Sequence, residues 1–115
     1  MHISQEPFDE TLVLHVHGNR IDAAEATNFK ELFRSATQEM PHRVVLNLKG
    51  VDFIDSSGLG AIVSAMKMLG PNDRLELCHL EEAVQKVFRL TRMDSVFSIY
   101  ETLDSALKEP DKLLM

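Results

Sequence analysis

The spacing of apolar residues along the chain predicts strands that alternate with helices. Residues 11–17 switch between apolar and polar side chains with a period of two, which is typical of a strand. Residues 44–48 form a short apolar run, which indicates a strand buried on both faces, and its one polar member, Asn47, should hydrogen-bond a neighbouring loop. In residues 23–40 apolar side chains return every three or four positions, and this predicts a helix that Pro41 ends.

The same pattern gives the remaining elements. We expect a short strand near Ile3, a helix from 55–58 to about Leu69, a strand over 75–80, a helix over 81–91, a short strand over 96–100 and a short helix over 102–108. Helices of about 10–15 residues between strands imply crossover connections and a partly parallel sheet, whereas the first two strands are close enough in sequence to pair antiparallel. The sequence therefore predicts an α/β fold in which a mixed sheet of four or five strands packs with about four helices. We expect a single domain over residues 1–108 and a flexible C-terminal tail over 109–115.

Composition narrows the class of protein. The 115 residues are 44% hydrophobic and 26% charged, which suits one domain whose core needs no metal or disulfide. Cys78 is the only cysteine, so no internal disulfide forms, which fits a reducing compartment. The net charge is −6 without a local cluster of Lys and Arg, and an acidic protein repels the phosphate backbone of nucleic acids. Because the chain opens with no signal peptide and holds no apolar run near ~20 residues, we expect a cytoplasmic protein that binds neither nucleic acid nor membrane.

The sequence Asp-Ser-Ser-Gly at residues 55–58 lies between a predicted strand and a predicted helix. Ser56 therefore lies at or just before a helix N-terminus, where unpaired N–H groups and the helix dipole would tolerate a phosphoserine. Gly58 and Gly60 would let a partner approach the backbone closely. From the residue types alone, ordinary helix capping is the commoner reason for Asp, Ser and Gly at such a position.

The helix that follows is apolar nearly all the way round. Only Ser64 and Lys67 interrupt the apolar residues of 59–69, whereas a surface helix normally has one apolar stripe. Two interpretations stay open. The helix is packed between layers of the domain, or one of its faces meets a partner protein, for which its methionines would be suited.

Residues 45–48 and 51–60 together resemble the signature of the bacterial anti-sigma factor antagonists of the STAS superfamily. The shared pattern is an apolar strand, then Asp-Ser-Ser-Gly-Leu-Gly, then an apolar helix, and the resemblance extends over almost the whole chain. It implies a STAS-type domain that acts as a switch and not as an enzyme. In that family the serine directly after the aspartate, here Ser56, is phosphorylated by an anti-sigma factor that is also a serine kinase. The unphosphorylated protein captures this anti-sigma factor and frees a sigma factor for transcription, and a PP2C-type phosphatase resets the switch.

The resemblance also implies a partner-binding surface. Its residues are Asp22, Asp55, Ser56, Ser57, Gly58 and Leu59. Asp22 matches the aspartate of a family turn, although residues 18–22 are one residue longer than the usual spacing, and a plain N-cap would explain Asp22 equally well. On a loop that leads into a helix, Asp52 and Asp55 are expected to be a turn residue and a cap, and we also expect Ser57 to cap this helix. We expect the chain to be a monomer or a weak dimer.

Other functions remain as alternatives. The same switch could control secretion, motility or a signalling enzyme, or the domain could be an accessory subunit of a transporter. A hydrolase or phosphotransfer enzyme with Ser56 as nucleophile would need a histidine base that the sequence does not place. His15 and His17 share one strand face, but no cysteine or carboxylate at an obvious spacing completes a metal site, and no phosphate-binding loop is present. We therefore expect no metal and no cofactor, and a buried structural role for Cys78.

Overall fold

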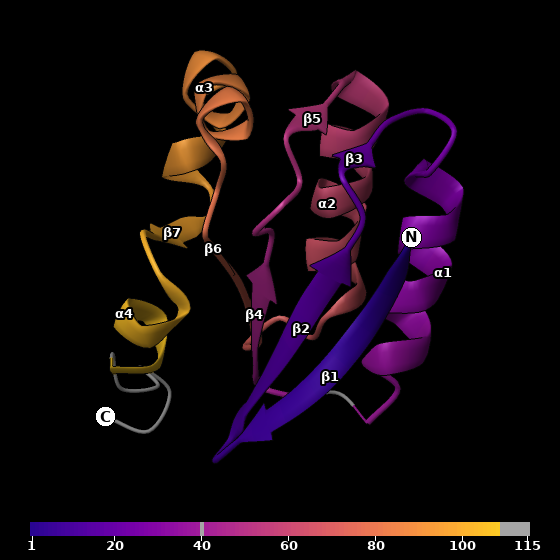
Figure 1. Cartoon of the computed structure of the whole chain (residues 1–115). Helices are drawn as coiled ribbons and strands as arrows, with labels where there is room; N and C mark the ends of the chain where they lie inside the picture. The colour runs from indigo at the N-terminus through magenta and orange to yellow at the C-terminus, as the bar shows by residue number, and fades with distance from the viewer. Residues whose placement is uncertain (40, 109–115) are drawn as a thin grey trace.

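The computed structural model describes residues 1–39 and 41–108 and is a mixed α/β structure (Figure 1). Its elements are β1 (His2–Phe8), β2 (Thr11–His17), β3 (Arg20–Ile21), α1 (Ala26–Ala36), β4 (Arg43–Asn47), β5 (Phe53–Ile54), α2 (Ser56–Met68), β6 (Arg74–Cys78), α3 (Glu82–Leu90), the 3₁₀ turn η1 (Met93–Ser95), β7 (Ser98–Tyr100) and α4 (Leu103–Lys108). The main sheet has five strands in the order β1-β2-β4-β6-β7, of which only the β1–β2 pair is antiparallel. The predicted mixed sheet with about four helices is confirmed; the predicted tail, 109–115, and Met40 lie outside the described residues.

Strand β4 lies at the centre of the sheet, as its unbroken apolar sequence predicted. Val44, Val45 and Leu46 have no exposed surface. The side-chain oxygen of Asn47 accepts a hydrogen bond from the backbone N–H of Lys49 at 3.0 Å, which confirms that this polar group holds the loop after the strand. The amide nitrogen of Asn47 also lies 3.0 Å from Nδ1 of His15, so the same side chain links β4 to β2.

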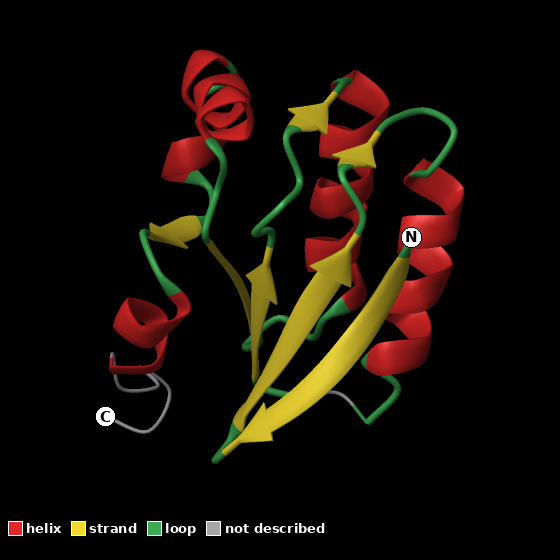
Figure 2. Ribbon diagram, in the orientation of Figure 1, coloured by secondary structure: helices red, strands yellow, loops and turns green. Residues whose placement is uncertain are grey.

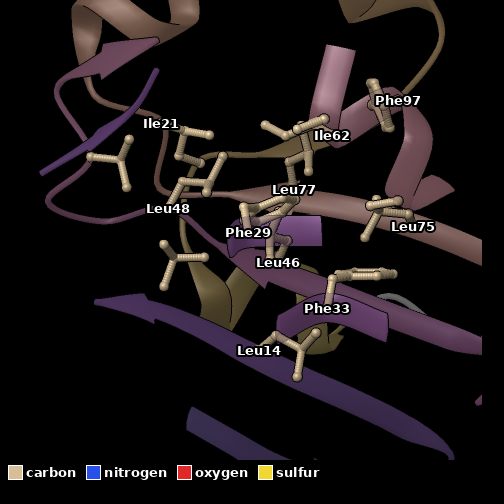
Figure 3. Packing of buried hydrophobic residues seen from close by; sticks show 14 of the residues in the cluster. Leu14, Ile21, Phe29, Phe33, Leu46, Leu48, Ile62, Leu75, Leu77 and Phe97 are labelled. Atoms are coloured by element: carbon tan, nitrogen blue, oxygen red, sulfur yellow. The ribbon is translucent and has the colours of Figure 1, made fainter. Parts of the chain in front are cut away.

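The main core lies between one face of the sheet and helices α1, α2 and α3 (Figure 2). Figure 3 shows aromatic rings of α1 and an isoleucine of α2 packed over leucines from three adjacent strands; the labelled residues include Leu14, Phe29, Phe33, Leu46, Ile62 and Leu77. The opposite face of the sheet is covered by α4 through a smaller apolar cluster of Val45, Cys78 and Ala106. Burial raises the pKa of the Cys78 thiol to about 12, so the cysteine is a protonated, structural side chain.

A buried ion pair lies on the second face of the sheet. Arg43 and Glu76 are 3% and 2% exposed, and Nε of Arg43 lies 2.7 Å from Oε1 of Glu76. Arg43 also donates from Nη2 to the backbone carbonyl of Ala106 at 2.6 Å. One guanidinium therefore ties β4 and β6 to α4.

The first helix is shorter than its apolar periodicity predicted. It begins at Ala26 because residues 22–25 form a turn in which the carbonyl of Asp22 accepts from the N–H groups of Glu25 and Ala26 at 3.0 and 2.8 Å. It ends at Ala36, where the hydroxyl of Thr37 bonds back to the carbonyl of Phe33 at 2.9 Å. The predicted capping role of Asp22 is found one turn before the helix, since Oδ1 of Asp22 accepts from the N–H of Glu25 at 3.1 Å in the turn that precedes Ala26.

Candidate functional site

Two loops from distant parts of the chain are joined by a small parallel sheet. Its strands are β3 and β5, with Arg20 opposite Phe53 and Ile21 opposite Ile54. The N–H of Asp52 adds a hydrogen bond to the carbonyl of Asn19 at 2.9 Å. Figure 1 shows β3 and β5 side by side next to the start of α2. Because both strands end one residue before an aspartate, this sheet brings the Asp22 turn next to the Asp-Ser-Ser-Gly turn. We call the region formed by residues 19–23 and 52–59 the switch face.

The carboxylate of Asp55 holds the two turns of the switch face together. Its Oδ1 accepts from the N–H of Gly58 at 2.9 Å, which caps the N-terminus of α2. Its Oδ2 accepts from the N–H of Ala23 at 3.1 Å, in the turn that follows Asp22. The prediction that Ser57 caps α2 is wrong, because Asp55 occupies the cap position and Ser57 is an exposed residue within the first turn of the helix.

We expect the two substitutions at this helix start to differ in stability. Asp55→Ala should lower the free energy of unfolding by about 1–2 kcal/mol, since it removes the cap and the bond to Ala23. Ser57→Ala should change it by less than about 0.5 kcal/mol, as for other surface positions. Urea denaturation of both variants beside the wild type gives the comparison, and equal losses in the two would contradict Asp55 as the cap.

Gly58 is required by a close contact inside the domain. It is buried, and a Cβ added to it would lie 1.8 Å from the carbonyl oxygen of Ile21 and 2.9 Å from Cγ1 of Ile54. The absence of a side chain lets β3 lie directly against the first turn of α2. This corrects the expectation that Gly58 opens the backbone to a partner. Gly60 is exposed, and a Cβ added to it would meet no atom within 4 Å, so space for a close approach exists at that glycine.

The remaining residues of the expected partner surface differ in exposure. Ser56, the first residue of α2, and Ser57 are exposed, whereas Leu59 is half-buried. The side chain of Asp22 is 16% exposed and pairs with Arg20, whose Nε lies 3.2 Å from Oδ2 of the aspartate. The structure thus brings Asp22, Asp55 and the two serines to one end of the molecule, with Ser56 open to solvent.

The apolar residues of α2 are explained mainly by packing within the domain. Ala61, Ile62 and Ala65 are buried in the core, and Leu59, Val63, Met66 and Met68 are half-buried against it. The most open positions of this helix are Ser56, Ser57, Gly60 and Lys67. Of the two interpretations of its sequence, packing between layers therefore accounts for most of the helix, and the open surface is concentrated at its N-terminal turn.

Four of the histidines hydrogen-bond to groups other than Ser56. His15 contacts Glu6 at 2.7 Å, His17 contacts Ser4 at 2.8 Å and His42 contacts Asp73 at 2.8 Å. His79 accepts from the N–H of Leu103 at 3.1 Å. Within residues 1–39 and 41–108 no histidine hydrogen-bonds Ser56, and no three His, Cys, Asp or Glu side chains are arranged to hold a metal ion. Over the same residues, every helix is too short or too polar to cross a bilayer.

Comparisons with known proteins find similarity over most of the chain. The STAS domain family model matches residues 2–106. An anti-sigma-B factor antagonist of Staphylococcus epidermidis is 29% identical over 100 residues, which cover 86% of this chain and 89% of that protein. The Staphylococcus aureus protein of the same name is 25% identical over 99 residues, covering 85% and 88%. The crystal structure of an anti-sigma factor antagonist from Mycobacterium paratuberculosis superimposes with a TM-score of 0.82 at 28% identity, covering 91% of this chain and 89% of that one.

Proposed function

This chain belongs to the STAS domain family, and from that premise we propose that it is an anti-sigma factor antagonist switched by phosphorylation of Ser56. Its relatives from Staphylococcus epidermidis and Staphylococcus aureus carry the name anti-sigma-B factor antagonist. The observation that carries the proposal is the exposed Ser56 at the first position of α2, on a turn that the Asp55 carboxylate braces from both sides. The domain acts by binding and release, and the catalysis belongs to its partners.

The partner is an anti-sigma factor that is also a serine kinase. Unphosphorylated, the switch face docks on this kinase, and a sigma factor held by the kinase is set free for transcription. The kinase then transfers the γ-phosphoryl group of ATP to Oγ of Ser56. The new P–O bond replaces the bond to ADP, and the hydroxyl proton leaves to a base of the kinase. A PP2C-type phosphatase restores the serine by hydrolysis.

The position of Ser56 explains why one group can serve as a switch. In the free protein, the N–H groups of Ser56 and Ser57 have no intrahelical partners, and the helix dipole favours a negative charge there by about 0.3–1 kcal/mol. In the complex, the added charge of about −1.5 to −2 must lose its hydration and lies against the phosphates of ADP. Phosphorylation is therefore compatible with the fold and unfavourable for the complex.

The decisive experiment uses substitutions at Ser56 with the purified kinase. Ser56→Glu should bind the kinase at least about a hundredfold more weakly than the wild type, because a charge is desolvated in the interface. Ser56→Ala should bind like the wild type and take up no phosphate. Calorimetric titration measures the binding, and mass spectrometry after incubation with ATP and kinase locates the phosphate.

Ser57→Ala is the matched control, since it removes the neighbouring exposed hydroxyl and leaves the Asp55 cap in place. It should still be phosphorylated at Ser56. Phosphate on Ser57 with Ser56 unmodified would overturn the site. Unchanged binding by the protein phosphorylated at Ser56 would overturn the release mechanism.

The switch could also serve another output, such as control of secretion, motility or a signalling enzyme, or the domain could serve a transporter as an accessory subunit. The first group of outputs would use Ser56 in the same way, and the same experiment applies with the kinase of that system. A transporter subunit would not need the exposed serine, so absence of phosphorylation by any cognate kinase would favour that class.

A further inference from the structure

An aromatic ring is exposed on the switch face without a packing role that explains its position. Phe53 is 50% exposed on β5, whereas the next residue, Ile54, is 5% exposed and packs in the core. Neighbouring residues of a strand point to opposite sides, so the ring of Phe53 points outward as Ile54 points inward. Among the described residues, only Phe8, Leu90 and Val96 are other large hydrophobic side chains with comparable exposure.

The backbone that carries Phe53 is fixed on both sides. Its strand pairs with β3, in which Arg20 is the partner of Phe53. The residue before it, Asp52, donates to the carbonyl of Asn19 at 2.9 Å, and Asp55, two residues after it, is the cap of α2. A rigidly presented aromatic ring loses little conformational freedom when it is buried by a partner, which is a common property of residues that dominate binding energy.

The charge of the switch face indicates the chemistry of the surface that covers the ring. Its residues include three aspartates and one arginine, Arg20, so the face is acidic. Asp22 pairs with Arg20 and Asp55 accepts from the N–H groups of Ala23 and Gly58, whereas Asp52, the residue before Phe53, is exposed. A complementary surface would therefore have an apolar pocket for the ring and basic side chains at its rim. A basic rim around the Phe53 pocket is compatible with release of the kinase after phosphorylation. Ser56 would face the nucleotide of the kinase and not the basic side chains of the rim.

We propose that Phe53 is the principal anchor of the switch face and inserts into an apolar pocket with a basic rim on the anti-sigma factor kinase. This inference rests on the proposed function, since it takes the kinase as the partner. Phe53 supplies apolar contact area that does not depend on phosphorylation, and Ser56, three residues later, supplies the charge that reverses binding. Phe53 would thus determine the affinity for the kinase, and phosphorylation of Ser56 on the same rigid turn would determine its release.

The test compares two exposed phenylalanines at separate places in the fold. Unphosphorylated Phe53→Ala should bind the kinase about thirtyfold or more weakly than the wild type, as for other buried aromatic anchors. Phe8→Ala removes a ring of similar exposure, 45%, on β1 and should bind within about twofold of the wild type. Phe53→Thr removes the ring and keeps a residue that favours strands, so it should repeat the loss even if Phe53→Ala disturbs β5. Binding is measured by calorimetric titration, and thermal unfolding reports on folding.

The outcomes separate this inference from the proposed function. Weak binding by both Phe53 variants, with folded protein and a normal Phe8→Ala, supports the anchor. Wild-type affinity in folded Phe53→Thr overturns the anchor and leaves the Ser56 switch standing. Failure of the wild-type protein to bind any anti-sigma factor kinase overturns the proposed function, and the anchor with it.

Discussion

Replacing Gly58 with alanine is expected to lower the free energy of unfolding by about 3 kcal/mol or more, although alanine is the better helix former. The added Cβ would lie 1.8 Å from the carbonyl oxygen of Ile21, well inside contact distance. Ile21 cannot move away easily, because it is fully buried and its strand pairs with β5. Relief of the clash must therefore separate β3 from α2 and disturb the whole switch face.

Gly60→Ala is the matched control two residues later in the same helix. Gly60 is exposed and a methyl group there meets nothing within 4 Å, so the substitution should stabilise the protein by about 0.5–1 kcal/mol. Opposite signs for the two variants in urea denaturation would establish the contact. A Gly58→Ala protein as stable as the wild type would show that β3 and α2 are not in close contact.

The second large effect is expected at the buried ion pair. Glu76→Ala should cost about 3–5 kcal/mol of stability, because it removes the carboxylate that lies 2.7 Å from Nε of the buried Arg43 and 3.8 Å from Nη2 of the partly exposed Arg74. The double variant Arg43→Met with Glu76→Leu removes both fully buried charges, fills similar volume and leaves only the partly exposed Arg74, so it should recover most of that loss. Chemical denaturation of the single and double variants measures the difference.

The exposed pair between Glu31 and Arg34 on α1 provides the comparison. Their separation is also 2.7 Å, but both side chains are more than half exposed, so Glu31→Ala should cost less than about 0.5 kcal/mol. Equal costs for the two glutamates would mean that water reaches the Arg43 site. A double variant as unstable as Glu76→Ala would show that loss of the pair itself, and not the burial of Arg43 without Glu76, lowers stability.

Elements with strong periodicity could be predicted from the sequence. The strand at residues 11–17 and the apolar strand that begins near Val44 appear within one residue of their predicted bounds, since alternation and unbroken burial each have a clear sequence signature. The start of α2 could be predicted from its Asp-Ser-Ser-Gly sequence. The choice between Asp55 and Ser57 as cap could not, because both side chains are good acceptors; in the structure it is Oδ1 of Asp55 that accepts from the N–H of Gly58.

Contacts between distant segments could not be predicted. Strands β3 and β5 have two residues each, too few for any periodic signal, and their pairing depends on the rest of the fold. Arg43 and Glu76 are charged residues for which the usual expectation is exposure, and only the pairing of β4 with β6 and the docking of α4 make them a buried pair. The predicted strand over 96–100 begins only at Ser98, because the N–H groups of Val96 and Phe97 bond to the carbonyl of Met93 in the 3₁₀ turn η1.

Because β3 pairs with β5, the switch face is a discontinuous epitope, formed by two segments that are distant in the sequence. The N–H of Ala23 and the carboxylate of Asp55 are 32 positions apart in the sequence, yet they form one hydrogen bond of this face. A peptide that copies residues 52–60 would lack the strand and the turn that give Ser56 its surroundings. A kinase that reads this surface would modify folded molecules and pass over nascent or unfolded chains, so phosphorylation would report on intact protein alone.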